Sequence, residues 1–173
     1  GLLLKSAGYK VAPIKFENYL NMDAGTINPI EHGDPFLCED GTEADMDIGT
    51  YEKFLDEDMG RDNFVTMGEI YKTVIDRERR FEYQGEDVEA IPHITNEITA
   101  RIKKLAGKKN ADIAIIELGG TAGEYQNIFY YDAFSLVDQI LRGLFLAGLF
   151  KDRILFFFDL FKASFMLFFI LLG

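Results

Sequence analysis

The sequence predicts an α/β fold in which helices flank a parallel sheet. Short apolar runs occur at residues 11–14 and 113–116, and runs of this kind are typical of strands buried on both faces. Segments with helical periodicity alternate with these runs, which favours parallel strands joined by helices. With 173 residues, the chain is long enough for one domain with a substantial core and too short for two full domains.

The first part of the chain is predicted to contain a helix end, a strand and a long loop. GLLLKSAGYK is typical of the last turns of a helix, with Gly8 suited to the position after its C-cap. A strand, KVAPIKF, follows. Because no N-cap precedes the helix, we expect the chain to begin inside a strand-helix-strand unit whose first strand is absent. Residues 17–47 are rich in Asn, Asp, Gly and Pro, which predicts an irregular loop with a hairpin at Glu39-Asp40-Gly41.

Helices dominate the middle of the chain. A short acidic helix is predicted in GTYEKFLDEDM, and a longer one in TMGEIYKTVIDRERRF, where Thr66 and Glu69 have the spacing of a capping box. A third helix runs through Ile98 and Leu105 and ends at Gly107. The strand ADIAIIE comes next, so strands and helices alternate as a parallel sheet requires.

Residues 134–173 differ sharply in composition from the rest. Phe and Leu dominate, and the last twenty residues contain only Asp159 and Lys162 as charges. The length approaches that of a membrane-spanning helix, whereas each central charge opposes insertion by roughly 2.5 to 3.5 kcal/mol. A membrane or interfacial helix and an aberrant, out-of-frame C-terminus both remain open. We therefore divide the chain into a domain at 1–133 and a hydrophobic tail at 134–173.

The charge balance and the cysteine count exclude several classes of function. The chain has 18 basic and 29 acidic residues, and its net charge of -11 argues against a nucleic-acid partner. Phosphates must then be held by local devices such as helix N-termini, a few lysines or a divalent metal. Cys38 is the single cysteine, so a disulfide within the chain is impossible. With no secretion signal apparent, these features predict a reducing, cytoplasmic setting.

Glu117 is the strongest candidate for a site residue. It lies inside the apolar strand ADIAIIE, directly before Leu118 and two glycines. Burying an unpaired charge is costly, so we expect this carboxylate to be paired, protonated or bound to a cation. Ligands of open α/β sheets bind beyond the carboxyl ends of the strands, where Glu117 is predicted to lie. A buried ion pair is the alternative interpretation.

Two further acids and a lysine are weaker candidates. Asp45 and Asp47 in EADMDIG alternate along a segment read as extended, so their side chains are predicted to face one site. Such carboxylates suit Mg²⁺, although a solvated acidic loop is the commoner explanation. Lys15 is predicted near the carboxyl end of its strand, where it can hold a phosphate or simply be exposed. For His32 and His93 a packed or solvated role is the commoner explanation, a hydrogen bond to a substrate is the alternative, and neither is predicted to be a metal ligand.

Several motifs together resemble a known family. NMDAGT, HGD, EDGTEADMDIGTYEKFLD, RDN, ERR, IPHIT and IIELGGTAGE occur in order across residues 1–133. In order and spacing they resemble the synthetase (amidoligase) domain of CTP synthase. The resemblance implies a P-loop NTPase-like fold of the dethiobiotin-synthetase type. The fold would be incomplete here, because the family's first strand and phosphate-binding loop would precede Gly1.

The resemblance also implies an ATP-dependent ligase of pyrimidine nucleotide biosynthesis. In this family ATP phosphorylates O4 of UTP, and ammonia then displaces the phosphate to give CTP. The ammonia comes from glutamine in a separate amidotransferase domain, and the whole enzyme is expected to be a homotetramer. Because the phosphate loop and that domain are missing from the sequence, we expect this chain to be inactive alone.

The resemblance assigns roles residue by residue. Asp47 and Glu117 match the Mg²⁺ ligands, and Asp47 also matches a residue of the ATP site. Lys15 matches a lysine near the transferring phosphate, as phosphoryl transfer requires positioning and charge neutralisation. Residues 124–126 (Glu124, Tyr125 and Gln126) match a segment that contacts the pyrimidine nucleotide, including CTP as a feedback ligand.

The sequence also departs from the family pattern. Glu17-Asn18 stands where Asp-Pro is common, Glu89 replaces a glutamine near the nucleotide, and GEYQN replaces the commoner GDIES. The last change leaves the feedback behaviour open. Two alternative functions follow from the departures and the tail: a non-catalytic nucleotide-binding or regulatory module, and a protein attached to a membrane through its C-terminal segment.

Overall fold

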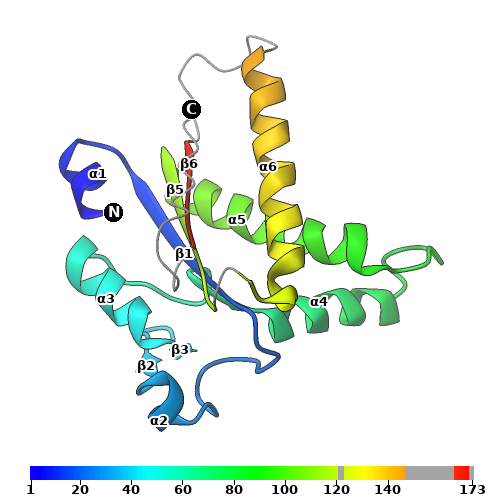
Figure 1. The fold of residues 1–173 in the computed structure, drawn as a ribbon, viewed down its shortest axis with the longest axis horizontal. Helices are drawn as coiled ribbons and strands as arrows, with labels where there is room; N and C mark the ends of the chain where they lie inside the picture. Colours follow the sequence, from blue (N-terminus) through cyan, green and yellow to red (C-terminus); the bar gives the residue numbers. More distant parts are fainter. Residues whose placement is uncertain (121–122, 147–165, 172–173) are drawn as a thin grey trace.

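The computed structural model describes residues 1–120, 123–146 and 166–171, and for 138–146 and 166–171 it describes the backbone alone. The chain forms a sheet between two groups of helices (Figure 1). The strand order is β4-β1-β5-β6, where the strands are β1 (Val11–Glu17), β4 (Phe64–Thr66), β5 (Ile113–Leu118) and β6 (Met166–Leu171). Strand β1 pairs in parallel with both β4 and β5. The predicted parallel sheet flanked by helices is therefore confirmed.

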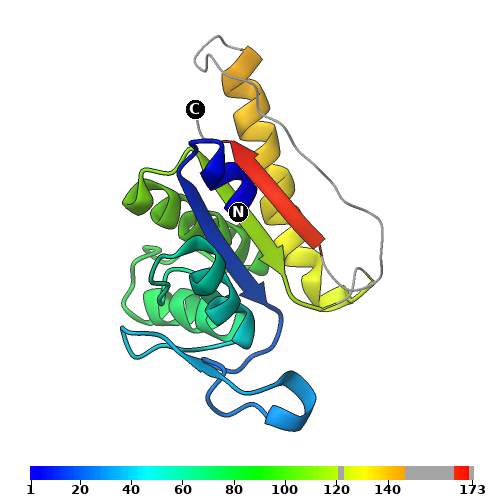
Figure 2. The ribbon, with the colours of Figure 1, turned by 90° about the vertical axis from the view of Figure 1, so that its left-hand side faces the viewer.

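Helices cover both faces of this sheet (Figure 2). On one side lie α1 (Leu2–Ser6) and α3 (Met46–Leu55), and on the other lie α4 (Met67–Arg79), α5 (Thr95–Lys109) and α6 (Ile128–Leu146). Two short helical turns, Ala90–Ile94 and Tyr125–Asn127, precede α5 and α6. The sequence predicted α1, α3, α4 and α5, although α3 begins three residues earlier than its predicted start at Gly49.

Alternate residues of β1 and β5 point to opposite faces, and this alternation separates the core from the site. Toward α4, α5 and α6 the two strands direct their small and large apolar side chains, which are Ala12, Ile14, Phe16, Ala114, Ile116 and Leu118. Toward α1 the strands direct Val11, Ile113 and Ile115, which pack with Leu4. Because successive side chains of a strand alternate, Lys15, Glu17 and Glu117 belong to this second face, the one that α3 approaches.

The long loop after β1 contains little regular structure. It carries the short helix α2 (Pro29–His32) and the antiparallel pair β2 (Phe36–Leu37) and β3 (Glu43–Ala44). The turn between these strands holds Asp40 and Gly41, whose φ of 84° favours glycine. The predicted hairpin at Glu39-Asp40-Gly41 is confirmed.

The hydrophobic tail is described only in part, so the predicted division at residue 133 stays a prediction. Helix α6 runs through residues 133 and 134, where we divided the chain. Residues 166–171 form a strand antiparallel to β5 rather than part of a helix, and residues 147–165 and 172–173 lie outside the described part. An apolar MLFFIL run suits a strand, and it covers an otherwise open edge of β5. Within the described residues, no helix is both long enough and apolar enough to span a bilayer.

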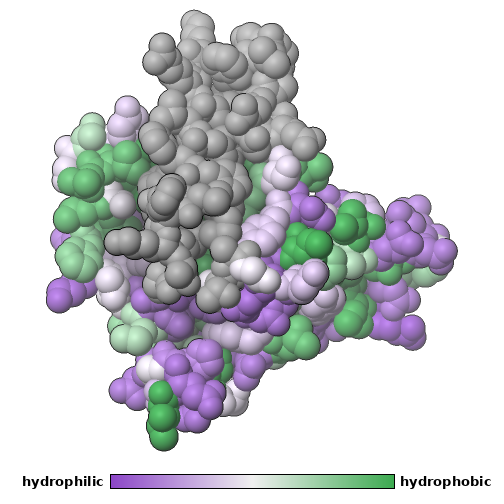
Figure 3. Space-filling model, in the orientation of Figure 1, coloured by the Kyte–Doolittle hydropathy of each residue, from purple (hydrophilic) through white to green (hydrophobic). Residues whose placement is uncertain are grey.

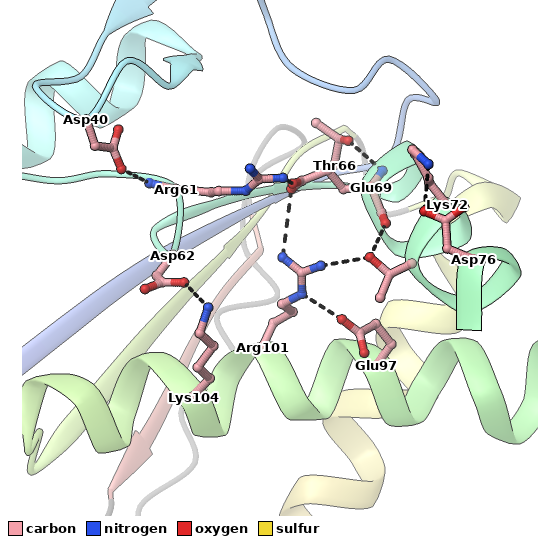
Figure 4. Close-up of polar contacts among 11 residues, drawn as sticks. Asp40, Arg61, Asp62, Thr66, Glu69, Lys72, Asp76, Glu97, Arg101 and Lys104 are labelled. Atoms are coloured by element: carbon pink, nitrogen blue, oxygen red, sulfur yellow. Dashed lines mark hydrogen bonds and ion pairs between the residues drawn. The ribbon is translucent and has the colours of Figure 1, made fainter. Parts of the chain in front are cut away.

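Charged residues link α4 to α5 along one side of the helical layer (Figure 4). Glu97 on α5 is 3% exposed and Glu69 on α4 is 6% exposed. Arg101 donates to Glu97 at 2.7 Å and lies 4.0 Å from Glu69. Each glutamate has a further partner at 2.7 Å, Arg77 for Glu97 and Arg61 for Glu69. We call these five residues the α4–α5 network.

The three most exposed of the large apolar side chains in the described part lie on separate elements. Leu3 on α1 is 86% exposed, Ile30 on α2 is 94% exposed and Tyr125 before α6 is 91% exposed. On the face in Figure 3, hydrophobic and hydrophilic residues are interspersed over α1, α2 and α4. Buried polar and charged side chains, by contrast, gather at the carboxyl edge of the sheet, where Lys15, Glu17 and Thr66 are all buried.

Candidate functional site

Two neighbouring strands place a lysine and two glutamates side by side. Lys15 on β1 lies directly opposite Glu117 on β5 in the parallel register. Glu17 ends β1 two residues later and so faces the same side as Lys15. Because β1 and β5 are parallel, their carboxyl ends lie at the same edge, which is where open α/β sheets bind ligands. The predicted positions of Lys15 and Glu117 at strand ends are confirmed.

The start of α3 brings two aspartates to these strands. Asp45 is the N-cap of α3, and its side chain accepts a hydrogen bond of 2.8 Å from the backbone N–H of Asp47. The prediction of an extended segment holds for Asp45 but is wrong for Asp47, because aspartate is a strong N-cap and a helix begins directly after it. Both carboxylates nevertheless face one place, since the helix starts directly beside the strand ends.

Lys15 lies at the centre of these acids. Its Nζ is 3.2 Å from Glu17 Oε1, 3.2 Å from Asp45 Oδ1 and 3.9 Å from Glu117 Oε1, and it donates a hydrogen bond to Asp47 Oδ2. Lys15 is 3% exposed, so the alternative of a solvent-exposed lysine is wrong. One ammonium faces four carboxylates, which leaves three formal negative charges uncompensated. We call these five residues the Lys15 cluster.

The excess of acid shifts the pKa values of the cluster. Burial raises the pKa of Glu17 to about 7, and Lys15 only partly opposes this shift. Burial also raises the pKa of Glu117, against the hydrogen bond from Tyr51 and the charge of Lys15. For Lys15 burial acts to lower the pKa, but Glu17, Asp47 and Asp45 outweigh it and the pKa is raised. All three shifts favour less negative charge in the cluster, so an additional cation would be stabilised there.

Two residues of this site were not predicted from the sequence. Tyr51 on α3 donates a hydrogen bond through Oη to Glu117 Oε2, and Glu17 contacts Lys15. The spacing contained a signal for both. Glu17 follows Lys15 by two residues on a strand, and Tyr51 follows Asp47 by four residues on a helix, so each pair shares a face.

The segment after β5 lies at the same edge of the sheet. Asn18, which follows β1, donates a hydrogen bond of 2.8 Å to Glu124 Oε2, and Gln126 donates one of 2.6 Å to the same oxygen. These contacts hold Glu124 and Gln126 beside the end of β1. Tyr125, between them, is 91% exposed. The structure therefore brings two of the three predicted nucleotide-contacting residues together and leaves the third facing outward.

The glycines after Glu117 have a structural reason. A Cβ at Gly119 would lie 2.2 Å from Glu17 Oε2, so a larger residue would displace that carboxylate. Gly120 has a φ of 81°, in the left-handed region that favours glycine. The backbone at these two glycines therefore lies close to Glu17 and Asn18 of the same chain.

The histidines lie elsewhere, and the carboxylates have the donor chemistry of a magnesium site. His93 is buried and packs edge-on against Tyr83 at 4.8 Å between ring centroids, and His32 packs against Tyr19 at 6.3 Å. Among the described residues no group of three or more His, Cys, Asp and Glu is arranged as a metal centre. Carboxylate oxygens are nonetheless the protein ligands that Mg²⁺ prefers. The donor set fits this metal, although its oxygens are now arranged around an ammonium.

A comparison with known families covers all of these residues. Residues 1–143 match the family model described as the CTP synthase N-terminus. The chain belongs to this family. The match confirms the resemblance seen in the motifs, and it extends into α6, beyond residue 133.

Individual CTP synthases show the same similarity. The chain is 50% identical to the CTP synthase of Methanococcoides burtonii over 142 residues, which are 82% of this chain and 26% of that protein. It is 49% identical to the enzyme of Symbiobacterium thermophilum and 48% identical to that of Thermus thermophilus, each over 133 residues, 77% of this chain and 25% and 24% of those proteins. The chain thus spans about a quarter of the length of the curated relatives it matches.

Proposed function

We propose that this chain supplies part of the synthetase site of a CTP synthase, which aminates UTP to CTP at the expense of ATP. The observation that carries the proposal is the Lys15 cluster at the carboxyl edge of a parallel sheet, in a chain of the CTP synthase N-terminal family. A buried lysine among acids, at the edge where such sheets bind ligands, is suited to phosphoryl transfer.

Each member of the cluster has a proposed role. Lys15 binds the transferring phosphoryl group through its ammonium. Asp47 and Glu117 hold Mg²⁺, and Asp47 also borders the ATP. When bound, the metal would neutralise charge on the phosphate oxygens. Tyr51 positions Glu117, because its hydroxyl donates to one carboxylate oxygen and leaves the other directed toward Lys15.

The pyrimidine nucleotide is proposed to bind at the neighbouring segment. Glu124 and Gln126 are fixed beside β1 by the contact with Asn18, and Tyr125 offers an exposed ring. In this proposal they contact UTP as substrate and CTP as feedback ligand. Because GEYQN differs from the commoner family sequence, the strength of the feedback is left to measurement.

The rest of the activity is proposed to belong to the remainder of a longer protein. Ammonia would come from glutamine in an amidotransferase domain, and the whole enzyme would be a cytoplasmic homotetramer. We expect the 173-residue chain alone to make no CTP. A non-catalytic nucleotide-binding module is the weaker proposal, because it gives no reason for a buried lysine held among four acids.

A chimaera tests the proposal. Residues 1–133 replace the corresponding segment of the Methanococcoides burtonii CTP synthase, and CTP is measured by chromatography after incubation with UTP, ATP, Mg²⁺ and ammonia. We expect CTP formation, and we expect Lys15→Ala to abolish it. A matched control is Lys53→Ala on α3, a lysine outside the cluster. A folded, tetrameric chimaera without CTP formation would refute the proposal.

A further inference from the structure

Lys15 stands between the two proposed metal ligands. Its ammonium donates to Asp47 on one side and lies 3.9 Å from Glu117 on the other. Its further neighbours, Glu17 and Asp45, are both 3.2 Å away. The carboxylate oxygens that a metal would need are therefore already directed at a cation that belongs to the chain.

Because of the charge balance, the position of the Lys15 ammonium and the binding of a metal ion depend on each other. With Lys15 in place, four carboxylates share one positive charge, and if the ammonium left alone, all four would be uncompensated. Buried charges without partners are strongly unfavourable. The excess of acid attracts a second cation, but the Lys15 ammonium occupies the space between Asp47 and Glu117, so a metal can bind both only when Lys15 moves aside. The metal then takes over the charge that Lys15 supplied.

The side chain is suited to such an exchange. Lysine carries a compact charge on a flexible four-carbon stem, so its head can move while the strand stays fixed. The backbone of Lys15 is held in the sheet, with its N–H donating to Asn63 O at 2.8 Å. The oxygens of an incoming phosphate can accept hydrogen bonds from the Lys15 ammonium. The carboxylates that Lys15 leaves are then free to bind the metal.

We propose that Lys15 is the resident counter-ion of the metal site, and that its ammonium and a divalent metal exclude each other from the carboxylates of Asp47 and Glu117. Metal binding is consequently weak until a phosphate-bearing nucleotide draws Lys15 away. This inference rests on the proposed function and goes beyond it. There Lys15 only binds phosphate, whereas here it also controls when the metal binds.

The test measures metal binding without nucleotide. The full 173-residue chain is titrated with Mn²⁺, and free Mn²⁺ is followed by electron paramagnetic resonance. Lys15→Met removes the ammonium and keeps a side chain of similar length. We expect this variant to bind Mn²⁺ at least ten-fold more tightly than the wild type, because the carboxylates have lost their internal cation.

Two control variants separate exchange from net charge. Lys104→Met removes one positive charge from a side chain that is 63% exposed and pairs with Asp62, away from the cluster. We expect its Mn²⁺ affinity to equal that of the wild type. Lys15→Met combined with Glu17→Gln leaves three acids and no lysine, so the cluster keeps its formal charge. The double variant has one unpaired carboxylate fewer than Lys15→Met, so it can be measured even if Lys15→Met alone does not fold.

The double variant decides the matter. We expect it to bind Mn²⁺ at least ten-fold more tightly than the wild type despite the equal charge. An affinity equal to that of the wild type, or an equal gain in Lys104→Met, would overturn the inference. Adding Asp47→Asn to the double variant should remove the gain, and a gain that persists would overturn the placing of the metal. The proposed function is judged separately, by CTP formation in the chimaera.

Discussion

The α4–α5 network and the Lys15 cluster are both groups of buried charges, but their compositions differ. In the network Glu97 has two arginine partners, Arg77 and Arg101, and Glu69 is shared between Arg61 and Arg101. In the cluster one lysine serves four acids. In the network each glutamate has an arginine partner within the chain, whereas the acids of the cluster outnumber their one lysine by three. Fully paired acids suit a structural role, whereas buried acids in excess, with shifted pKa values, are typical of a binding site.

The two groups also differ in the type of basic residue: the α4–α5 network contains arginines, and the Lys15 cluster contains a lysine. The planar guanidinium of Arg101 forms directed hydrogen bonds to Glu97 and to Thr73 Oγ1, at 2.7 Å and 3.0 Å, and so fixes α5 against α4. Lys15 is a point charge on a flexible stem and can change partners. The difference predicts that substitutions in the network reduce stability, whereas substitutions in the cluster reduce activity.

The largest effect is expected at the proposed metal ligands. In the chimaera, Glu117→Gln removes a charge and keeps the size of the side chain, and Asp47→Asn does the same on α3. Each should reduce the rate of UTP phosphorylation by about 10²-fold or more, about 2.7 kcal/mol in the barrier. The double substitution should cost less than the two losses combined, because residues that serve one ion act as a unit. Single-turnover kinetics measures these rates.

A matched control for these variants is Glu57→Gln, since Glu57 pairs with Lys5 and Lys109 outside the cluster. It should retain its rate. Full activity of Glu117→Gln with unchanged Mg²⁺ dependence would return Glu117 to the role of a buried ion-pair partner.

The next effect is a loss of stability in the network. Arg101→Met leaves Glu69 and Glu97 with one arginine each and should lower the free energy of unfolding by about 2 kcal/mol. This is less than the loss of a whole buried partner, because Arg61 and Arg77 remain. Denaturant titration measures the change, and the rate per folded chimaera should stay constant. If Arg101→Met lowered the rate of CTP formation and left the free energy of unfolding unchanged, the assignment of the network to stability would be wrong.

A smaller, pH-dependent effect is expected at Glu17. Its pKa is raised from 4.5 to about 7 in the folded chain, so between these values the folded state binds more protons than the unfolded state. The free energy of unfolding should therefore fall as the pH rises through this window, by on the order of 1 kcal/mol. Denaturant titrations in the presence of a chelator should show this fall in the wild type and a flatter profile in Glu17→Gln. Identical profiles would contradict the burial of a charged Glu17.

The smallest effect is expected at the surface. Hydrogen bonds from Lys104 and Lys108 lower the pKa of Asp62 below 3.8. A carboxyl whose pKa is lower in the folded state stabilises the fold at pH values above its pKa in the unfolded state. This stabilisation is lost as the pH falls through the pKa in the folded state. Lys104→Met should therefore cost only about 0.5 kcal/mol at neutral pH, because exposed pairs contribute little. The cost should vanish in acid, and a cost that persists there would point to lost packing by the lysine stem.

The sequence was sufficient where one strand or one motif carried the signal. The apolar run around Glu117 predicted both its strand and its position at the site, and Lys15 followed from the same reasoning. The three-residue strand β4 is too short to show periodicity. Asp47 was predicted to continue the extended segment, because the sequence did not show that α3 begins directly after Asp45. Tyr51 contacts Glu117 only because the fold places α3 beside β5. Its spacing from Asp47 predicts that the two share a helix face, but it does not identify Glu117 as the hydrogen-bond partner.

The pairing of Lys15 with Glu117 has a consequence for folding. Ile14 and Phe16, the neighbours of Lys15 on β1, are fully buried on the opposite face. A slip of one residue between β1 and β5 would exchange the faces, placing Lys15 among the apolar core side chains and Phe16 among the acids of the cluster. Packing of the core therefore selects the register that also assembles the site. A chain with the wrong register would lose buried apolar contacts and be less stable, whether or not a ligand is present. Selection for a well-packed interior and selection for a correctly assembled site act here on the same alignment of two strands.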